Sequence, residues 1–224
     1  GAGGGIQATA GQTSGGAQGG FVRIDGGVSA PNGGQGGYIS LVSGAGTERS
    51  SGKIVVKTVN AGTKGISGAL EFTSGASTSG NSGEIKLTTG TGVLGKSGDI
   101  TLNVGSGNTG TGGLVGITAG TTTAGSGVGG AITLTSGDSN DGNTGAIDLI
   151  TDAGAAVTGA IGLTTGDSTG AASGDVAVTT GTSGATTTGT LTLETGASTT
   201  GGKGGALTLS VGNAQTGAGG DIQA

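Results

Sequence analysis

The sequence predicts an all-β protein, a single-chain β-solenoid (β-helix) with coils of about 15 residues. Two observations lead to this prediction. A phrase with two aliphatic residues in alternate positions recurs along the whole chain, and glycine, which supplies 60 of the 224 residues, separates the copies. Alternation of apolar and polar residues is typical of a strand with one buried face, and no stretch keeps the helical spacing of about 3.6 residues. We therefore expect one strong Ile/Leu strand in each coil.

Each copy of the phrase reads Gly-x-φ-x-φ, and we call its two apolar φ residues a doublet. The doublets are Val22/Ile24, Ile39/Leu41, Ile54/Val56, Leu70/Phe72, Ile85/Leu87, Ile100/Leu102, Val115/Ile117, Ile132/Leu134, Ile147/Leu149, Ile161/Leu163, Val176/Val178, Leu191/Leu193 and Leu207/Leu209. A weaker copy, Ile6/Ala8, precedes them, and a partial copy, Ile222/Ala224, follows. The first residues of successive doublets lie 14 to 17 residues apart. A flexible Gly/Ser/Thr-rich linker would have no reason to keep such a phase.

Short stretches of small residues, such as "GDSNDG" and "GASTTG", lie between the doublets. We expect each stretch to form a turn and a second, thinner wall of Ala, Ser and Thr that packs against the Ile/Leu wall. Residues 1–224 then form one continuous repeat array. Neither end carries the polar capping unit that solenoids normally need, so we expect a window of a longer array.

The composition excludes several chemistries. The sequence has no Cys and no His, so it offers no disulfide framework, no thiolate or imidazole metal ligand and no nucleophilic triad built on those residues. We therefore expect no enzymatic activity and no cofactor. No apolar run approaches the ~20 residues of a membrane span.

The net charge of −5 is unevenly distributed. Residues 1–112 contain seven Lys/Arg and five Asp/Glu, whereas 113–224 contain one lysine and eight Asp/Glu. No basic stripe exists, so we expect no nucleic-acid partner. The slightly basic half, 1–112, and the acidic half, 113–224, favour self-association, end to end or laterally.

Threonine is frequent at outward positions of the predicted strands and forms a candidate surface ladder: Thr88, Thr118, Thr133, Thr135, Thr164 and Thr179. Flat Thr-x-Thr ladders on β-solenoids resemble the ice-binding faces of antifreeze proteins. Only 133–135 is a full Thr-x-Thr in register, and charged residues interrupt the face elsewhere. The simpler interpretation is that Thr is a good strand residue.

Phe21 and Tyr38 form a candidate aromatic patch, because both directly precede a doublet in neighbouring repeats. One interpretation is a stacked pair that covers a coil edge. The other is a platform for carbohydrate.

Acidic residues offer two further candidates. Asp138 and Asp141, with Asp152 and Asp167 nearby, could supply oxygen ligands for calcium. The calcium-binding nonapeptide G-G-x-G-x-D does not occur, and turn aspartates usually bond their own backbone, so we predict no metal site.

Glu84 and Asp99 occupy equivalent positions in neighbouring repeats. Paired carboxylates can perform acid–base catalysis. On a solvated surface the two carboxylates would instead repel each other mildly, and Lys86 would reduce this repulsion. We therefore predict no catalytic site.

The phrases "SGEIKLTTGTG", "GGAITLTSGDS" and "SGDVAVTTGTS" resemble very long secreted repeat proteins of diatoms and related microalgae. Bacterial adhesin stalks and phage fibres show a similar cadence. The resemblance implies an extracellular or cell-surface location and a structural role, with extracellular matrix or glycan as partners. We therefore expect a stiff extracellular fibre, surface layer or adhesive stalk made of stacked β-coils. The alternative is a binding module that uses a flat Thr-rich face for ice or glycan.

Overall fold

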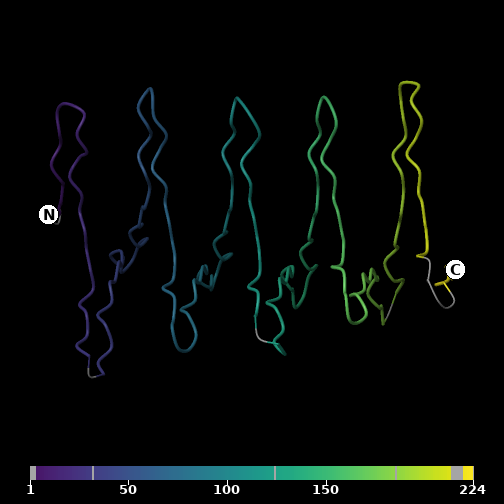
Figure 1. Cartoon of the computed structure of the whole chain (residues 1–224), viewed down its shortest axis with the longest axis horizontal. Helices are drawn as coiled ribbons and strands as arrows, with labels where there is room; N and C mark the ends of the chain where they lie inside the picture. Colours follow the sequence, from purple (N-terminus) through teal and green to yellow (C-terminus); the bar gives the residue numbers. More distant parts are fainter. Residues whose placement is uncertain (1–3, 32, 124, 185, 213–218, 224) are drawn as a thin grey trace. The chain divides into compact units, whose positions relative to one another are not determined.

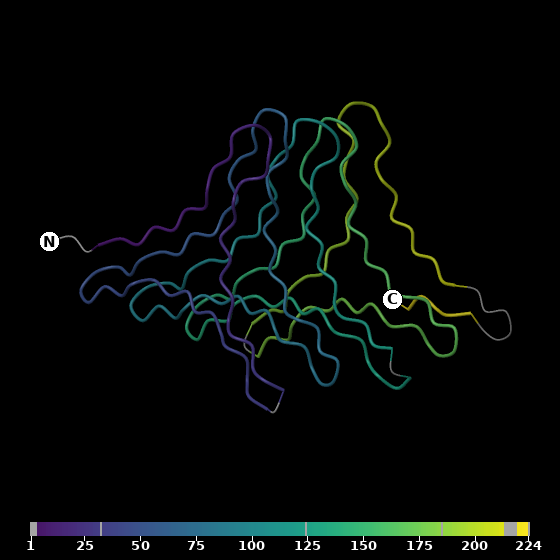
Figure 2. The same cartoon turned by 60° about the vertical axis from the view of Figure 1, so that its left-hand side comes forward.

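The computed structural model describes residues 4–31, 33–123, 125–184, 186–212 and 219–223. Within these ranges no residue lies in a helix or a strand (Figure 1). The chain divides into two units, Gly1–Gly113 and Leu114–Ala224. In each unit extended segments alternate with sharp bends, and the first bend, 14–16, is the purple loop near the N-terminus (Figures 1 and 2).

The prediction of an all-β fold and of a β-solenoid is therefore wrong. An extended segment becomes a strand only when a neighbouring backbone pairs with it in a ladder of hydrogen bonds. Among the described residues, backbone hydrogen bonds join neighbouring segments once per bend, and only at some bends. They run from the amide to the carbonyl in Gly20–Gly11, Gly37–Gly27, Gly52–Gly44, Gly130–Gly120 and Gly145–Gly137, at 2.8 to 3.0 Å.

The sequence separation of these contacts explains why the chain forms no solenoid. Stacked coils would bring together residues about one repeat apart, because each coil would lie on the previous one. The bends instead reverse the chain, so that the amide of Gly20 meets the carbonyl of Gly11. The alternating pattern is present in the sequence, but the backbone that should pair with each segment is not beside it.

Glycine conformation accounts for several of the reversals. Bends lie at 14–16, 47–49, 63–65, 78–80, 93–95, 108–111, 140–142, 169–171 and 199–201, among others. Gly80 and Gly110, in two of these bends, have φ angles of 106° and 75°. Residues with a Cβ rarely adopt such angles, whereas glycine does so at little cost. Positive φ is confined to glycine throughout the described part of the chain.

The base of each bend is a close contact that we call a neck. It joins the residue two positions after one doublet to the glycine two positions before the next. At Gly83, for example, an added Cβ would lie 3.7 Å from the Cβ of Ser74. The necks are Ala10–Gly20, Gly26–Gly37, Ser43–Gly52, Thr58–Gly68, Ser74–Gly83, Thr89–Gly98, Val104–Gly113, Ala119–Gly130, Ser136–Gly145, Thr151–Gly159, Thr165–Gly174, Thr180–Gly189, Thr195–Gly205 and Val211–Gly220.

Burial follows the necks. None of the described residues is buried, so this part of the chain has no hydrophobic core. Apart from Ser29, the partly buried residues all belong to necks: Ala10, Gly26, Ser43, Ala119, Ser136 and Thr165. The stretches predicted to form the second wall, such as 75–80, 137–142 and 196–201, are exposed, so they do not pack against the Ile/Leu residues. The aliphatic side chains remain in contact with solvent.

Candidate functional surface

The doublets are the most extensive candidate surface. Their side chains are exposed in every repeat that the structure describes, with Ile147 at 52% and Leu149 at 63% exposure as typical values. Exposed apolar surface is unfavourable in water by about 25 cal/mol per Å². Contiguous exposed apolar patches usually mark sites of interaction. The doublets are therefore suited to contact with another apolar surface.

One neck brings two doublets close enough to form a shallow pocket. Phe72 lies two residues before the neck at Ser74–Gly83, and Ile85 lies two residues after it. Phe72, Ile85 and Leu87, together with Lys86, line a pocket with a volume of about 290 Å³. Its walls are mainly aliphatic and aromatic, so it suits a small apolar group.

The predicted threonine ladder is exposed at all six positions: Thr88, Thr118, Thr133, Thr135, Thr164 and Thr179. Thr133 and Thr135 lie in one extended segment. The flat face that a ladder requires would come from paired strands, which are absent from the described ranges. The hydroxyls are accessible, and a binding role for them stays a prediction.

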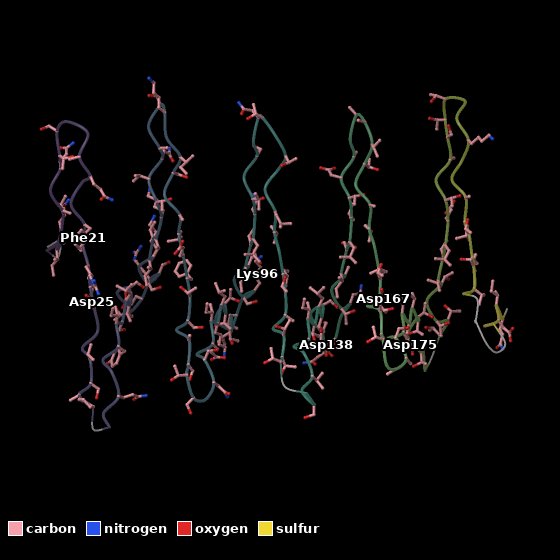
Figure 3. All side chains as sticks on the ribbon, in the orientation of Figure 1. Phe21, Asp25, Lys96, Asp138, Asp167 and Asp175 are labelled. Atoms are coloured by element: carbon pink, nitrogen blue, oxygen red, sulfur yellow. The ribbon has the colours of Figure 1, made fainter. Side chains whose placement is uncertain are left out.

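The two aromatic side chains of the predicted patch are also exposed. Phe21 is 85% exposed and Tyr38 is 90% exposed. Each ring directly follows the glycine of a neck, Gly20 or Gly37 (Figure 3 labels Phe21). Accessible rings of this kind suit the apolar face of a sugar, and this role also stays a prediction.

Two of the four acidic side chains considered for calcium make local hydrogen bonds. The Oδ1 atoms of Asp138 and Asp152 each accept a hydrogen bond from the next backbone amide, Ser139 N and Ala153 N, at 2.8 Å. Within the described residues no group of three or more acidic side chains comes together around a point. Asp138 and Asp152 thus stabilise the start of their own bends.

Two ion pairs occur in the described residues. Arg23 Nε lies 2.7 Å from Asp25 Oδ2, and Lys96 Nζ lies 3.1 Å from Asp99 Oδ2. All four side chains are largely exposed. Such pairs contribute between about 0 and 1 kcal/mol. Asp99, one of the two carboxylates considered for catalysis, thus already has a cationic neighbour.

Two segments of the chain carry a concentrated charge of one sign. The basic segment, 49–64, contains four cations and no acid: Arg49, Lys53, Lys57 and Lys64. The acidic segment, 138–152, contains four acids and no cation: Asp138, Asp141, Asp148 and Asp152. All eight side chains are exposed. Each segment spans about one repeat, so a count of charge per repeat would have found both.

In the part of the chain that the structure covers, no helix has the length and apolar character needed to cross a membrane. No protein-family model, no curated protein and no solved structure matches the chain.

Proposed function

We propose that the chain is a non-enzymatic structural protein of an extracellular or cell-surface fibre, layer or adhesive stalk. The observation that carries this proposal is the exposed doublet, which recurs in every described repeat. A surface that repeats at nearly constant spacing can make the same contact many times along a partner. The total contact then grows with the number of repeats, as in other repeat proteins.

The extracellular location rests on the resemblance of the repeat cadence to secreted repeat proteins. The absence of His and Cys from the sequence supports a non-enzymatic role, because common nucleophilic triads need those residues. Stacked coils would have made the chain stiff, but the described residues contain no strands, so the proposed fibre, layer or stalk does not depend on such stiffness.

Immunogold electron microscopy of intact source cells tests this proposal. We expect gold label on extracellular fibres, on a surface layer or on stalks, with no permeabilisation needed. Label that appears only after permeabilisation would contradict the location. Label on dispersed single molecules outside the cell would contradict the structural role.

Glycan binding is a second candidate, carried by the exposure of Phe21 and Tyr38. Screening of the purified protein on a glycan array tests it. A hit that disappears in a Phe21→Ala/Tyr38→Ala variant supports it, and a hit unaffected by both substitutions contradicts the involvement of the rings. No observation among the described residues favours the ice-binding alternative, because the flat face it requires would come from paired strands.

A further inference from the structure

We propose that a second copy of this chain docks on the doublets in antiparallel register, with the basic segment of each copy against the acidic segment of the other. This inference rests on the proposed structural function and names the partner. Its basis is the combination of exposed apolar side chains with opposite charge in two repeats.

The two segments carry equal and opposite charge. Together they hold eight of the 21 charged residues, four cations in 49–64 and four acids in 138–152. The ion pairs between described residues, at Arg23–Asp25 and Lys96–Asp99, use none of these eight. Both segments therefore present a concentrated charge of one sign to solvent, and each complements the other.

The two segments also match in apolar content. The basic segment exposes Ile54, Val55 and Val56, between 55% and 59%. The acidic segment exposes Ile147, Leu149 and Ile150, between 52% and 82%. An apolar centre flanked by charge is the usual arrangement of a protein–protein contact. The charges would select the partner segment, and the aliphatic side chains would provide most of the contact.

The spacing of the repeats favours a second copy over a fold-back of one chain. In sequence order, pairing Ile54 with Ile147 in the antiparallel sense gives each of the seven doublets that begin at 54, 70, 85, 100, 115, 132 and 147 a counterpart in the other copy. A single chain folding back would have to bend near Ile100. Only three pairs of doublets could then meet, and the central doublet would have no partner.

The antiparallel register is preferred over a parallel one for two reasons. A two-fold arrangement makes the basic–acidic contact twice in each pair of chains, whereas a parallel offset makes it once. A parallel offset of six repeats would also place Glu84 opposite Asp175, which are like charges. The expected species is a closed dimer of two 20.2 kDa chains.

Analytical ultracentrifugation tests this inference. We expect a dimer at about 50 mM salt that weakens at about 500 mM salt, because salt screens exposed charges. Lys53→Glu/Lys57→Glu should raise the dissociation constant by at least about tenfold. Adding Asp148→Lys/Asp152→Lys to the same chain should restore association. Arg23→Glu/Lys96→Glu makes the same change in net charge outside the segments and should have a much smaller effect.

Several results would overturn the inference. These are a monomer at all concentrations, a dimer that responds equally to both pairs of substitutions, and compaction without a change in mass, which indicates a fold-back. Assemblies that grow one chain at a time, with no dimer, would overturn the antiparallel register, because a parallel offset leaves one segment of each chain unpaired. None of these results would alter the location of the gold label, so failure of the dimer and failure of the proposed function can be told apart.

Discussion

Substitution of a single glycine should open one neck and leave its neighbours closed. At the Gly26–Gly37 neck, a Cβ added to Gly26 would collide with the carbonyl oxygen of Gly37, closer than real Cβ atoms approach backbone. The same neck holds a 2.8 Å hydrogen bond from Gly37 N to Gly27 O. Gly26→Ala should separate the two segments and break this bond. Gly27→Ala is the matched control, because a Cβ there has nothing within 4 Å and Gly27 keeps its carbonyl.

The expected magnitude follows from the hydrogen bond. An exposed backbone hydrogen bond contributes about 0.5–1.5 kcal/mol net, which corresponds to roughly 2- to 13-fold protection from amide exchange. Hydrogen exchange measured by NMR at the Gly37 amide should therefore show this protection in the parent chain and in Gly27→Ala. Gly26→Ala should lose it. Equal protection in Gly26→Ala and Gly27→Ala would refute the idea that close backbone approach requires glycine in the neck.

Two further predictions concern a bend and the pocket. Gly110→Ala should strain the bend at 108–111, where φ is 75°, by about 1–2 kcal/mol. The nuclear Overhauser effect between Val104 and Gly113 should weaken, but not in the control Gly112→Ala, where a Cβ has open space; equal effects would contradict the strain. Phe72→Ala should remove one wall of the pocket, so that an apolar dye shifts the remaining pocket methyl signals less than in the parent chain; an unchanged shift would show that the pocket does not bind it.

The repeat itself could be predicted from sequence, and the strand pairing could not. The spacing of the doublets fixes where each neck forms, because Ser74 and Gly83 keep the same distance from their doublets as the other neck pairs do. Alternation such as Ile85-Lys86-Leu87 reports that one face is apolar. It does not report which backbone lies beside that face.

The role of each glycine could not be predicted from the sequence either. Gly80 lies at a reversal with positive φ, whereas Gly83 lies in a neck. Both are glycine, so the residue type alone does not tell the two roles apart. Of the candidate site residues, Phe21 and Tyr38 directly precede doublets in neighbouring repeats, and the aromatic patch built on them stays a prediction. The oppositely charged segments were missed, because a count over each half of the chain sets the cations of 49–64 against acids elsewhere in 1–112 and does not show that four acids gather in 138–152.

The necks have a mechanical consequence. At five necks a backbone hydrogen bond joins two points of the chain that are close in sequence, such as Gly11 and Gly20, and so keeps the intervening loop slack. A stretched residue spans about 3.3–3.6 Å, so opening that neck would release roughly 30 Å of chain. Because each neck depends on its own local contact, we expect necks to open one after another under tension. A fibre built from this chain would then yield in small steps before it breaks.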